Sequence, residues 1–369
     1  MPQVNAEVSC PVYDSFRVQQ VAGMFDVPLE QRSQRTFVVE VPGLDEDWQI
    51  GLIVGPSGSG KTTIARHAFG ERLISETAWP QDRAVVDCFG SLSTRQITGL
   101  LTAVGFGSPP AWVRPYHALS RGEQFRCDLA RALGAAMQEK GDAQANAAPL
   151  VAFDEFTSVV DRNVARIGSA AVAKSIRGGQ IPCRFVAVTC HYDVAEWLEP
   201  DWVVDMQRGT CQRRRLRRPR IELELHRCHH RLWNLFAPHH YLTGALNRAA
   251  RCYAALWQGV PVAFCATLAV IGRKNYWRIS RIVTLPDYQG VGIGMHVAEA
   301  VCELHLAAGC RMNVTASHPA MLAHCSRSPL WRTVRVKRTG SGDTRHFIAN
   351  YRSSSGRSVV SFEYLGNQS

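Results

Sequence analysis

The sequence of 369 residues lacks an apolar run long enough to cross a membrane. Its longest nearly uncharged apolar stretch, residues 259–272, is interrupted by Pro261, whereas a membrane-spanning helix needs about 20 apolar residues. Residues 1–7 also lack the basic segment and apolar core of a secretory signal. We therefore expect a soluble, cytoplasmic protein that has no membrane partner.

Paired cysteines are missing as well. The chain has 12 cysteines, but they are scattered and none forms a C-x-x-C pair. This scatter argues against a disulfide framework or a zinc ribbon, and it fits thiols packed in a reducing compartment.

The second part of the chain has few acidic residues. Residues 1–207 carry 18 Lys/Arg and 24 Asp/Glu, a formal charge of −6, whereas residues 208–369 carry 24 and 7, a charge of +17. This asymmetry indicates two domains and an anionic partner for the second. A basic face that is merely solvated is the alternative.

The most informative stretch lies between an apolar run at residues 50–54 and a helical pattern at residues 62–69. It fits G-x-x-x-x-G-K-[ST], in which backbone N–H groups and a helix N-terminus surround phosphates. Lys61 is expected to reach the β- and γ-phosphates, and the Thr62 hydroxyl to bind Mg²⁺. The predicted nucleotide-binding residues are Gly55, Pro56, Ser57, Gly58, Ser59, Gly60, Lys61, Thr62 and Thr63.

Patterns around this loop predict further elements. Residues 94–104 are expected to form a helix with one apolar face, followed by a loop rich in glycine and proline at residues 105–115. Phe25 and Phe37 are candidates for stacking on a nucleotide base, although aromatics on strands more often belong to a core. The stretches expected to be strands are residues 16–25, 36–41 and 84–89.

A capped helix is predicted next. Residues 119–124 read Leu-Ser-Arg-Gly-Glu-Gln and lead into a helical stretch at residues 125–137. Ser120 stands at the N-cap and Glu123 three residues later, which is the arrangement of a capping box.

Two carboxylates then follow an apolar strand at residues 149–155, which ends in Asp154 and Glu155. Such a strand can bring an aspartate to Mg²⁺ and a glutamate to a water molecule. Residues 158–161 come directly after it, and another apolar strand ends at His191.

These five motifs, in this order, resemble an ABC-type ATPase domain over residues 15–207. In the terms of that family they are Walker A at residues 55–62, the signature at 119–124, Walker B at 150–155, the D-loop at 158–161 and the H-switch at His191. The resemblance implies a head-to-tail homodimer in which ATP lies between the P-loop of one chain and the signature of the other. It also implies that Asp154 serves the metal, Glu155 acts on the attacking water and His191 contacts the γ-phosphate. The signature residues implied to contact the partner's nucleotide are Ser120, Gly122 and Gln124.

Three features depart from that family. The glutamine that normally contacts the metal is not evident, since only Asp87 and Gln96 stand nearby. Arg121 replaces a glycine of the signature. The segment between Walker A and the signature is also short for a transporter, which puts a transport role in doubt.

An arginine-rich stretch separates the two charge regions. Residues 208–220 are predicted to be a basic linker between domains at residues 1–207 and 221–369, and they either contact phosphates or merely connect. The histidine-rich residues 226–242 fit no standard zinc spacing, and we expect a loop that faces the substrate instead.

A second unit of strand, glycine loop and helix spans residues 277–308. Its loop has the pattern Q-x-x-G-x-G, and its N–H groups suit a pyrophosphate. The other stretches predicted here are strands at residues 221–225 and 311–316, a hairpin of 250–257 with 260–270, a helix at 319–325 and strands near 331–338, 346–351 and 358–364.

This order of elements resembles a GNAT-type N-acetyltransferase over residues 221–365. The family's thiolate-protonating tyrosine is replaced by His324, whose ordinary pKa near neutrality suits a general acid, although a satisfied surface histidine would look the same. The strand at residues 277–285 carries no carboxylate that could act as a base. The resemblance implies that the pyrophosphate of acetyl-CoA, or of another acyl-CoA, is held by Gln289, Gly290, Val291, Gly292, Ile293 and Gly294.

The predicted fold class is α/β, with a P-loop NTPase domain of the ABC type followed by an α+β GNAT-like acyltransferase domain. We expect ATP hydrolysis to gate an acyl-CoA-dependent N-acyltransferase whose acceptor is a nucleic acid or a protein bound to one. Two alternatives stay open. One is an ATP-driven switch or nucleic-acid-associated sensor whose GNAT-like domain only binds, and the other is the ATPase subunit of an ABC transporter.

Overall fold

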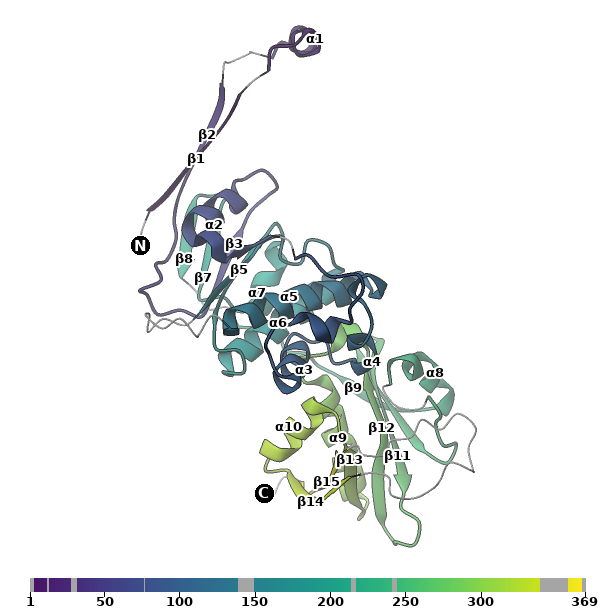
Figure 1. The fold of residues 1–369 in the computed structure, drawn as a ribbon. Coiled ribbons are helices and arrows are strands. Elements are labelled where there is room, and N and C mark those ends of the chain that lie inside the picture. The colour runs from purple at the N-terminus through teal and green to yellow at the C-terminus, as the bar shows by residue number, and fades with distance from the viewer. Residues whose placement is uncertain are drawn as a thin grey trace.

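The computed structural model describes residues 3–11, 13–27, 32–75, 77–138, 149–213, 217–240, 244–338 and 358–366. Within these ranges the chain forms three β-sheets, of two, six and seven strands. Figure 1 shows a narrow arm at the N-terminus, then a body around the six-stranded sheet, then a body around the seven-stranded sheet.

The six-stranded sheet is parallel at its centre. Its order is β4-β5-β6-β3-β7-β8, and β8 at the edge runs antiparallel to β7. Both faces of the central strand β3 are buried, because Leu52 packs into one apolar cluster and Ile53 into another on the opposite side. The strands are β3 (Ile50–Val54), β4 (Leu73–Ile74), β5 (Leu150–Phe153), β6 (Arg184–Thr189), β7 (Trp202–Asp205) and β8 (Thr210–Arg213).

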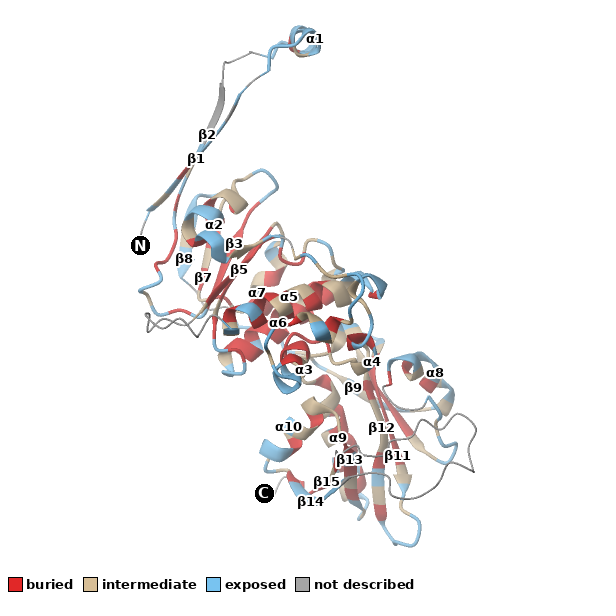
Figure 2. Cartoon of the chain, viewed as in Figure 1, coloured by how far each residue is buried: buried red, intermediate tan, exposed pale blue. Residues whose placement is uncertain are grey.

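Helices cover this sheet, and the longer ones begin at capping residues. Ser93 and Gln96 form a capping box at α3, as the sequence around residues 94–104 indicates, and Asp161 caps α6. Figure 2 shows that α5 and α6 are buried along much of their length. The helices are α2 (Lys61–Phe69), α3 (Thr94–Ala103), α4 (Pro109–Trp112), α5 (Arg121–Gln138), α6 (Arg162–Arg177) and α7 (Ala195–Leu198).

The predicted strand at residues 84–89 is wrong. Val85–Cys88 forms a 3-10 helix, and Ala84 makes only an isolated bridge to Pro115. The buried side chains here are Val85 and Phe89, four residues apart, and this spacing fits a helical turn rather than the alternation of a strand.

The N-terminal arm is a long hairpin with a helix at its far end (Figure 1). β1 (Gln3–Pro11) pairs antiparallel with β2 (Arg32–Glu40), which confirms the strand predicted over residues 36–41 apart from its last residue. The strand predicted over residues 16–25 is wrong, because this stretch is α1 (Phe16–Phe25), capped by the Ser15 side chain at Val18 N–H. A short apolar stretch without a neighbouring strand has no ladder to join, so local capping decides its structure.

The seven-stranded sheet has the order β14-β15-β13-β12-β11-β10-β9. Its neighbours run antiparallel except for β12 and β13, which are parallel. The strands are β9 (Glu224–Cys228), β10 (Arg251–Trp257), β11 (Val260–Ala269), β12 (Tyr276–Thr284), β13 (Arg311–Ala316), β14 (Trp331–Arg338) and β15 (Ser358–Tyr364). The helices of this part are α8 (Trp233–Phe236), α9 (Ile293–Ala307) and α10 (Pro319–Arg327).

Short 3-10 turns complete the described elements. They are η1 (Gly70–Arg72), η2 (Val85–Cys88), η3 (Tyr116–Ala118), η5 (Tyr192–Val194), η6 (His230–Leu232), η7 (Ala237–His239) and η8 (Pro286–Tyr288).

The local patterns of the second part predict most of its elements correctly. The hairpin turns at Gln258 and Gly259, whose φ angles of 52° and 78° match a tight two-residue turn. The first strand, β9, lies three residues later than predicted, and residues 346–351 lie outside the described residues.

One apolar cluster joins the two bodies. Ile167 and Ala170 of α6, which belongs to the body of the six-stranded sheet, pack with Val291 and Ile293 of the second glycine loop. All four side chains are buried. Because a close-packed interior tolerates little sliding, this cluster holds the two bodies in a defined orientation.

We predict that Ile167→Ala lowers the free energy of unfolding by about 2–4 kcal/mol, because it removes buried methyl groups and leaves a cavity between the two bodies. The fully exposed Ile271 provides a matched control, and Ile271→Ala should leave stability nearly unchanged. Urea denaturation measures both variants. Equal midpoints for the two would show that the cluster does not contribute to stability.

Candidate functional site

The first candidate site lies at the carboxyl edge of the parallel strands. β5, β6 and β3 are adjacent in the sheet, and they are followed in the sequence by Asp154, His191 and Gly55. Because the strands are parallel, these residues gather at one edge of the sheet, where α/β proteins bind their ligands.

The loop before α2 carries polar groups that the protein itself satisfies only in part. The Lys61 ammonium is buried and donates a hydrogen bond to Pro56 O at 2.9 Å. The Ser59 hydroxyl is also buried, and no partner is found for it among the described residues. Buried polar groups normally have partners, so these two fit a bound phosphate.

Three oxygen-bearing side chains converge at the end of β5. The Asp154 carboxylate is 3.2 Å from Thr62 Oγ1 and 3.4 Å from Ser75 Oγ. Hydroxyl and carboxylate oxygens of this kind suit Mg²⁺ when phosphates complete its coordination. Ser75 follows β4, and the sequence analysis missed it because no motif spacing singles it out.

Backbone strain is concentrated just after Asp154. Glu155 and Thr157 have φ angles of 50° and 67°, in the left-handed region that residues other than glycine seldom adopt. Glu155 N–H donates to Asp154 Oδ1 at 3.0 Å, which helps to hold this turn. The Glu155 side chain remains exposed at the edge of the sheet, where it can reach a water molecule.

His191 begins the turn that follows β6. Burial lowers the pKa of His191 and the nearby Arg162 lowers it further, although Asp193 and Glu155 act in the opposite direction. Arg162 and Arg166 of α6 both pair with Asp193, so this turn is tied to α6. The imidazole is therefore kept neutral and in place near pH 7.

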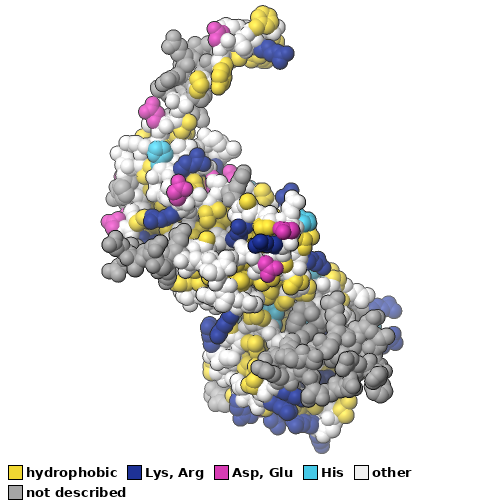
Figure 3. Space-filling model, in the orientation of Figure 1, with side chains coloured by type: hydrophobic (Ala, Val, Ile, Leu, Met, Phe, Trp, Pro, Cys, Tyr) yellow, Lys and Arg dark blue, Asp and Glu magenta, His cyan; other side chains and the backbone are white. Residues whose placement is uncertain are grey.

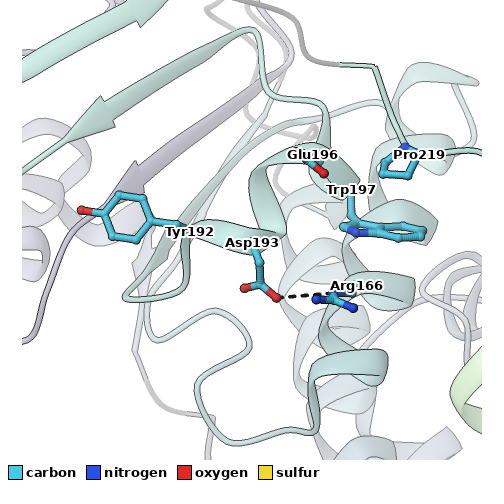
Figure 4. A pocket seen from close by; sticks show the side chains of 6 residues that line it. All are labelled: Arg166, Tyr192, Asp193, Glu196, Trp197 and Pro219. Carbon is cyan, nitrogen blue, oxygen red and sulfur yellow. Dashed lines mark ion pairs between the residues drawn. The ribbon is translucent and has the colours of Figure 1, made fainter.

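Beside this turn lies a hollow of about 320 Å³ (Figure 4), lined by Arg166, Tyr192, Asp193, Glu196, Trp197 and Pro219. Figure 4 shows the Arg166–Asp193 ion pair, with the Tyr192 ring pointing away from it. None of the predicted nucleotide-binding residues lines this hollow, so it is separate from the phosphate site.

The signature helix is capped as the sequence indicates. The Ser120 hydroxyl accepts a hydrogen bond from Glu123 N–H, and the Glu123 carboxylate accepts one from Ser120 N–H at 2.9 Å. Ser120 is exposed, whereas the Gln124 amide turns inward and donates to Tyr116 O. Ser120 and Gly122 are thus better placed than Gln124 to meet a ligand from outside.

The two aromatic candidates for base stacking lie in different places. Phe37 on β2 packs its ring against the backbone of Gly60 in the first glycine loop. Phe25 lies at the end of α1 on the arm and is 69% exposed. Only Phe37 therefore lies at the nucleotide loop, which excludes Phe25 from the site in this conformation.

The second candidate site is the loop Gln289–Gly294 at the start of α9. Among the described residues, no hydrogen-bond acceptor is found for the N–H groups from Gly290 to Met295. Gly292 has a φ angle of 102°, which L-residues with side chains rarely adopt. Free N–H groups at the positive end of a 15-residue helix suit a pyrophosphate.

A divergence of two strands accompanies this loop. β12 and β13 pair only from Tyr276 with Arg311 to Ile279 with Val314, after which β12 continues to Thr284 without β13. The opening between the strands lies at the carboxyl end of β13, close to the loop that follows β12.

His324 of α10 does not stand alone. Its Nε2 is 2.7 Å from Glu299 Oε1 on α9, and Trp331 Nε1 donates to the same oxygen at 3.0 Å. Burial alone would raise the pKa of Glu299, but these hydrogen bonds lower it below its ordinary value. The pair can hold and transfer a proton at His324.

Residues of the first body also touch the second glycine loop. Gly107 N–H donates to Gln289 Oε1 at 2.8 Å, and Gly107 O lies 3.1 Å from His318 Nε2. A Cβ on Gly290 would lie 2.7 Å from both Gly105 Cα and Ala171 Cβ, so the two backbones meet with no room for side chains. The Gln289 side chain is thus hydrogen-bonded to the first body, so only the rest of the loop is available to contact a ligand.

The histidine-rich segment forms no metal centre in the described part. Across the described ranges, no group of three or more His, Cys, Asp or Glu side chains is arranged to hold a metal ion. Residues 241 and 242 of that segment lie outside the described residues.

Residues 212–323 match the family model of the Acetyltransferase (GNAT) family. The chain contains a GNAT domain. No curated protein gives a significant match to the sequence. Within the described ranges, no helix combines the length and apolar character that crossing a bilayer requires.

Solved structures resemble the two bodies separately. An IAA acetyltransferase from Bacillus cereus ATCC 14579 is 17% identical over 39% of this chain and 99% of its own, with a TM-score of 0.29. A Bacillus subtilis acetyltransferase in complex with CoA is 13% identical over 39% and 98%, with a TM-score of 0.32. The dimeric ATP-binding cassette MJ0796 bound to ADP and Pi is 16% identical over 50% and 90%, with a TM-score of 0.36.

These similarities are low, so the fold assignment rests on the family match for the GNAT domain and on motif positions in the parallel sheet. The chain combines a mainly parallel six-stranded sheet that carries a P-loop motif with a GNAT domain. Arg126, Lys174 and Gly107, which face the GNAT domain from the first body, were not found from the sequence. They lie within ordinary helix or loop patterns, and no spacing rule marks them.

We predict that the stability difference between the wild type and Glu299→Gln depends on pH. Because the pKa of Glu299 is lowered in the folded state, its carboxylate stabilises the fold fully above the ordinary value of 4.5, and this contribution shrinks as the pH falls below it. Glu299→Gln should therefore be less stable than the wild type at neutral pH and should approach it in acid.

Urea midpoints at several pH values measure this difference. Glu222→Gln, which removes the charge of an exposed carboxylate, is the control. A difference that stays constant across the pH range would contradict the assigned role of the pair.

Proposed function

We propose that this protein hydrolyses ATP and that its nucleotide state gates an acyl-CoA-dependent N-acyltransferase in the same chain. The observation that carries the proposal is a pair of helices that connect the two glycine-loop sites. α5 begins in the signature, and α6 begins after the Asp161 cap in the D-loop. Both helices contact the GNAT domain at or beside its glycine loop.

The contact of α5 is electrostatic. Arg126 is 1% exposed, and its Nη1 donates to Gly122 O in the signature at 3.4 Å. Its Nη2 lies 3.8 Å from Asp287, two residues before Gln289. Burial lowers the pKa of Arg126, while Asp287 opposes that effect. A buried charge whose ion-pair partner lies 3.8 Å away responds to small shifts of its helix. A ligand bound at the signature would therefore change the contact between Arg126 and Asp287.

The contact of α6 is apolar. Ile167, Ala170 and Ala171 lie on one helical face and pack against the loop and its neighbours. A rigid helix that carries the D-loop at one end and the acyl-CoA loop along its side can transmit a movement between them.

The first site fits ATP and Mg²⁺. We assign phosphate binding to the loop Gly55–Thr63, with Lys61 as its cation, and metal binding to Thr62 and Asp154. Glu155 is proposed to activate the attacking water, and His191 to contact the γ-phosphate. The buried Ser59 hydroxyl without a partner supports this fit.

A second copy of the chain is proposed to complete the first site. Ser120 and Gly122 are accessible at the start of α5 and would contact nucleotide bound by the partner. The ATP-binding cassette described above is a dimer in its post-hydrolysis state, and we propose a head-to-tail homodimer for this chain.

The second site fits an acyl-CoA. In the proposed transfer an acceptor amine attacks the thioester carbonyl, a C–N bond forms and the C–S bond breaks. The amine loses a proton and the CoA thiolate gains one, which His324 is proposed to supply. Glu299 would orient the imidazole through its 2.7 Å contact with Nε2.

The basic charge of the second part supports an anionic acceptor. The charge of +17 over residues 208–369 contrasts with −6 before it. Figure 3 shows Lys and Arg side chains along the lower edge of the GNAT domain. We propose a nucleic acid, or a protein bound to one, as the acceptor.

The proposed domains are residues 1–207 and 221–369, joined by residues 208–220. Thr210–Arg213 in the joining segment forms β8, the edge strand of the first sheet. The segment is therefore anchored to the ATPase body at its start.

We predict that Glu155→Gln binds ATP without hydrolysing it and forms a stable dimer, because the metal and phosphate ligands remain while the general base is lost. In this variant ATP should change the dissociation constant of acetyl-CoA by about fivefold or more, and acetyl-CoA should change that of ATP by the same factor. Calorimetry and analytical ultracentrifugation measure these quantities.

Asp287→Asn should reduce this coupling while each ligand still binds. Unchanged affinities in the presence of the other ligand would refute gating. Binding of acetyl-CoA without thiol release on any amine would instead favour a switch with a non-catalytic GNAT domain.

We also predict that the protein binds DNA or RNA with an affinity that falls steeply with salt, because lysine and arginine contacts release counterions from phosphates. Filter binding at several salt concentrations provides the slope. Binding that is absent, or that does not depend on salt, would remove the support for a nucleic-acid acceptor.

A further inference from the structure

We infer that Lys174 of α6 belongs to the acyl-CoA site and neutralises the pyrophosphate there, so that both bodies of the chain bind the cofactor. This inference rests on the proposed acyl-CoA function of the loop Gln289–Gly294. It adds a residue of the ATPase body that neither motif includes.

The position of Lys174 follows from the packing of α6. Ala171 faces Gly290, and Lys174, one turn later on the same helical face, reaches Gly292. A Cβ built on Gly292 would lie 3.2 Å from Lys174 Nζ and 3.5 Å from His296 Nδ1. The Lys174 ammonium is thus beside Gly292, the glycine of this loop that has a φ angle of 102°. The side chain keeps contact with solvent, so a ligand can reach it.

Lys174 has no anionic partner within the protein. Among the described residues it makes no salt bridge, and the charged neighbour that acts on it is another cation, Arg218. Burial lowers the pKa of Lys174, and Arg218 lowers it further. The described surroundings therefore disfavour the charge that this side chain carries.

The dipole of α9 makes the surroundings of the Lys174 charge more unfavourable. The N-terminus of α9, which begins at Ile293, carries a partial positive charge. Its N–H groups carry partial positive charges and the side chains of Lys174 and Arg218 carry full ones, so all of them favour an anion at the loop. A diphosphate group can accept hydrogen bonds from the loop and from an ammonium at the same time.

The pyrophosphate is the part of an acyl-CoA that fits here. The free N–H groups run from Gly290 to Met295, and Lys174 lies against Gly292 in the middle of that run. The Lys174 ammonium, at the centre of the loop, therefore lies beside the pyrophosphate that the loop is proposed to bind.

This placement has a consequence for regulation. If nucleotide binding at the first site turned the Lys174 side chain away from the loop, the affinity for acyl-CoA would change without any sliding of α6. Cofactor binding would also tighten the interface, because it places an anion between cations of the two bodies.

The test compares Lys174→Met with Lys274→Met, which removes the same side chain from an exposed turn of the GNAT domain remote from the loop. Lys174→Met should weaken acetyl-CoA binding by about tenfold, the scale of one charge-assisted hydrogen bond. Lys274→Met should bind like the wild type, and Lys174→Arg should recover part of the loss. Calorimetry on the full-length chain gives the dissociation constants, and circular dichroism checks folding.

Two analogues identify the group that Lys174 contacts. S-acetylpantetheine lacks the pyrophosphate, so the wild type and Lys174→Met should bind it equally. Acetyl-3′-dephospho-CoA keeps the pyrophosphate, and the loss should persist with it. A loss that also appears with S-acetylpantetheine, or that vanishes with the dephospho analogue, overturns the assignment.

The outcomes separate this inference from the proposed function. Absence of acetyl-CoA binding by the wild type would refute the acyl-CoA function itself. Wild-type binding that Lys174→Met leaves unchanged would refute only the role of Lys174.

Discussion

The packing of α6 against the loop Gln289–Gly294 is the contact on which the other features of this structure depend. Ile167 and Ala170 are buried against the residues around that loop, and the backbones of Gly105 and Gly290 meet without space for a side chain. A close-packed contact between a helix and a glycine loop resists sliding, because any shift opens voids or creates clashes. The orientation of the two sheets and the position of the loop Gln289–Gly294 are therefore set together.

The same contact explains how chemistry at one site could affect the other. α5 and α6 each begin in a motif of the nucleotide site and each reach the GNAT domain. The α5 contact depends on a buried guanidinium with a partner at 3.8 Å, and the α6 contact depends on apolar packing. A polar contact that weakens with a small shift and an apolar one that does not can together define two discrete arrangements.

Electrostatics has a similar part at both glycine loops. Each loop lies at the start of a helix, and each has a lysine beside it, Lys61 within its own loop and Lys174 from the other body. An anion is bound well where positive groups cannot find partners within the protein. The excess of basic residues after residue 207 adds further positive charge to the part of the chain that contains the GNAT domain.

Much of this protein could be predicted from local sequence, because both glycine loops, their flanking strands and the carboxylates of β5 depend on residues close together in the chain. The N-terminal helix α1 and the turn at Val85–Cys88 could not, because a short apolar stretch does not distinguish a strand from a helical turn until its buried residues and neighbours are known. The contacts of Ser75 with Asp154, of Arg126 with Asp287 and of Lys174 with Gly292 join residues far apart in the sequence. Such partners meet only when strands pair within a sheet or when the two bodies pack, so the tertiary structure alone decided them.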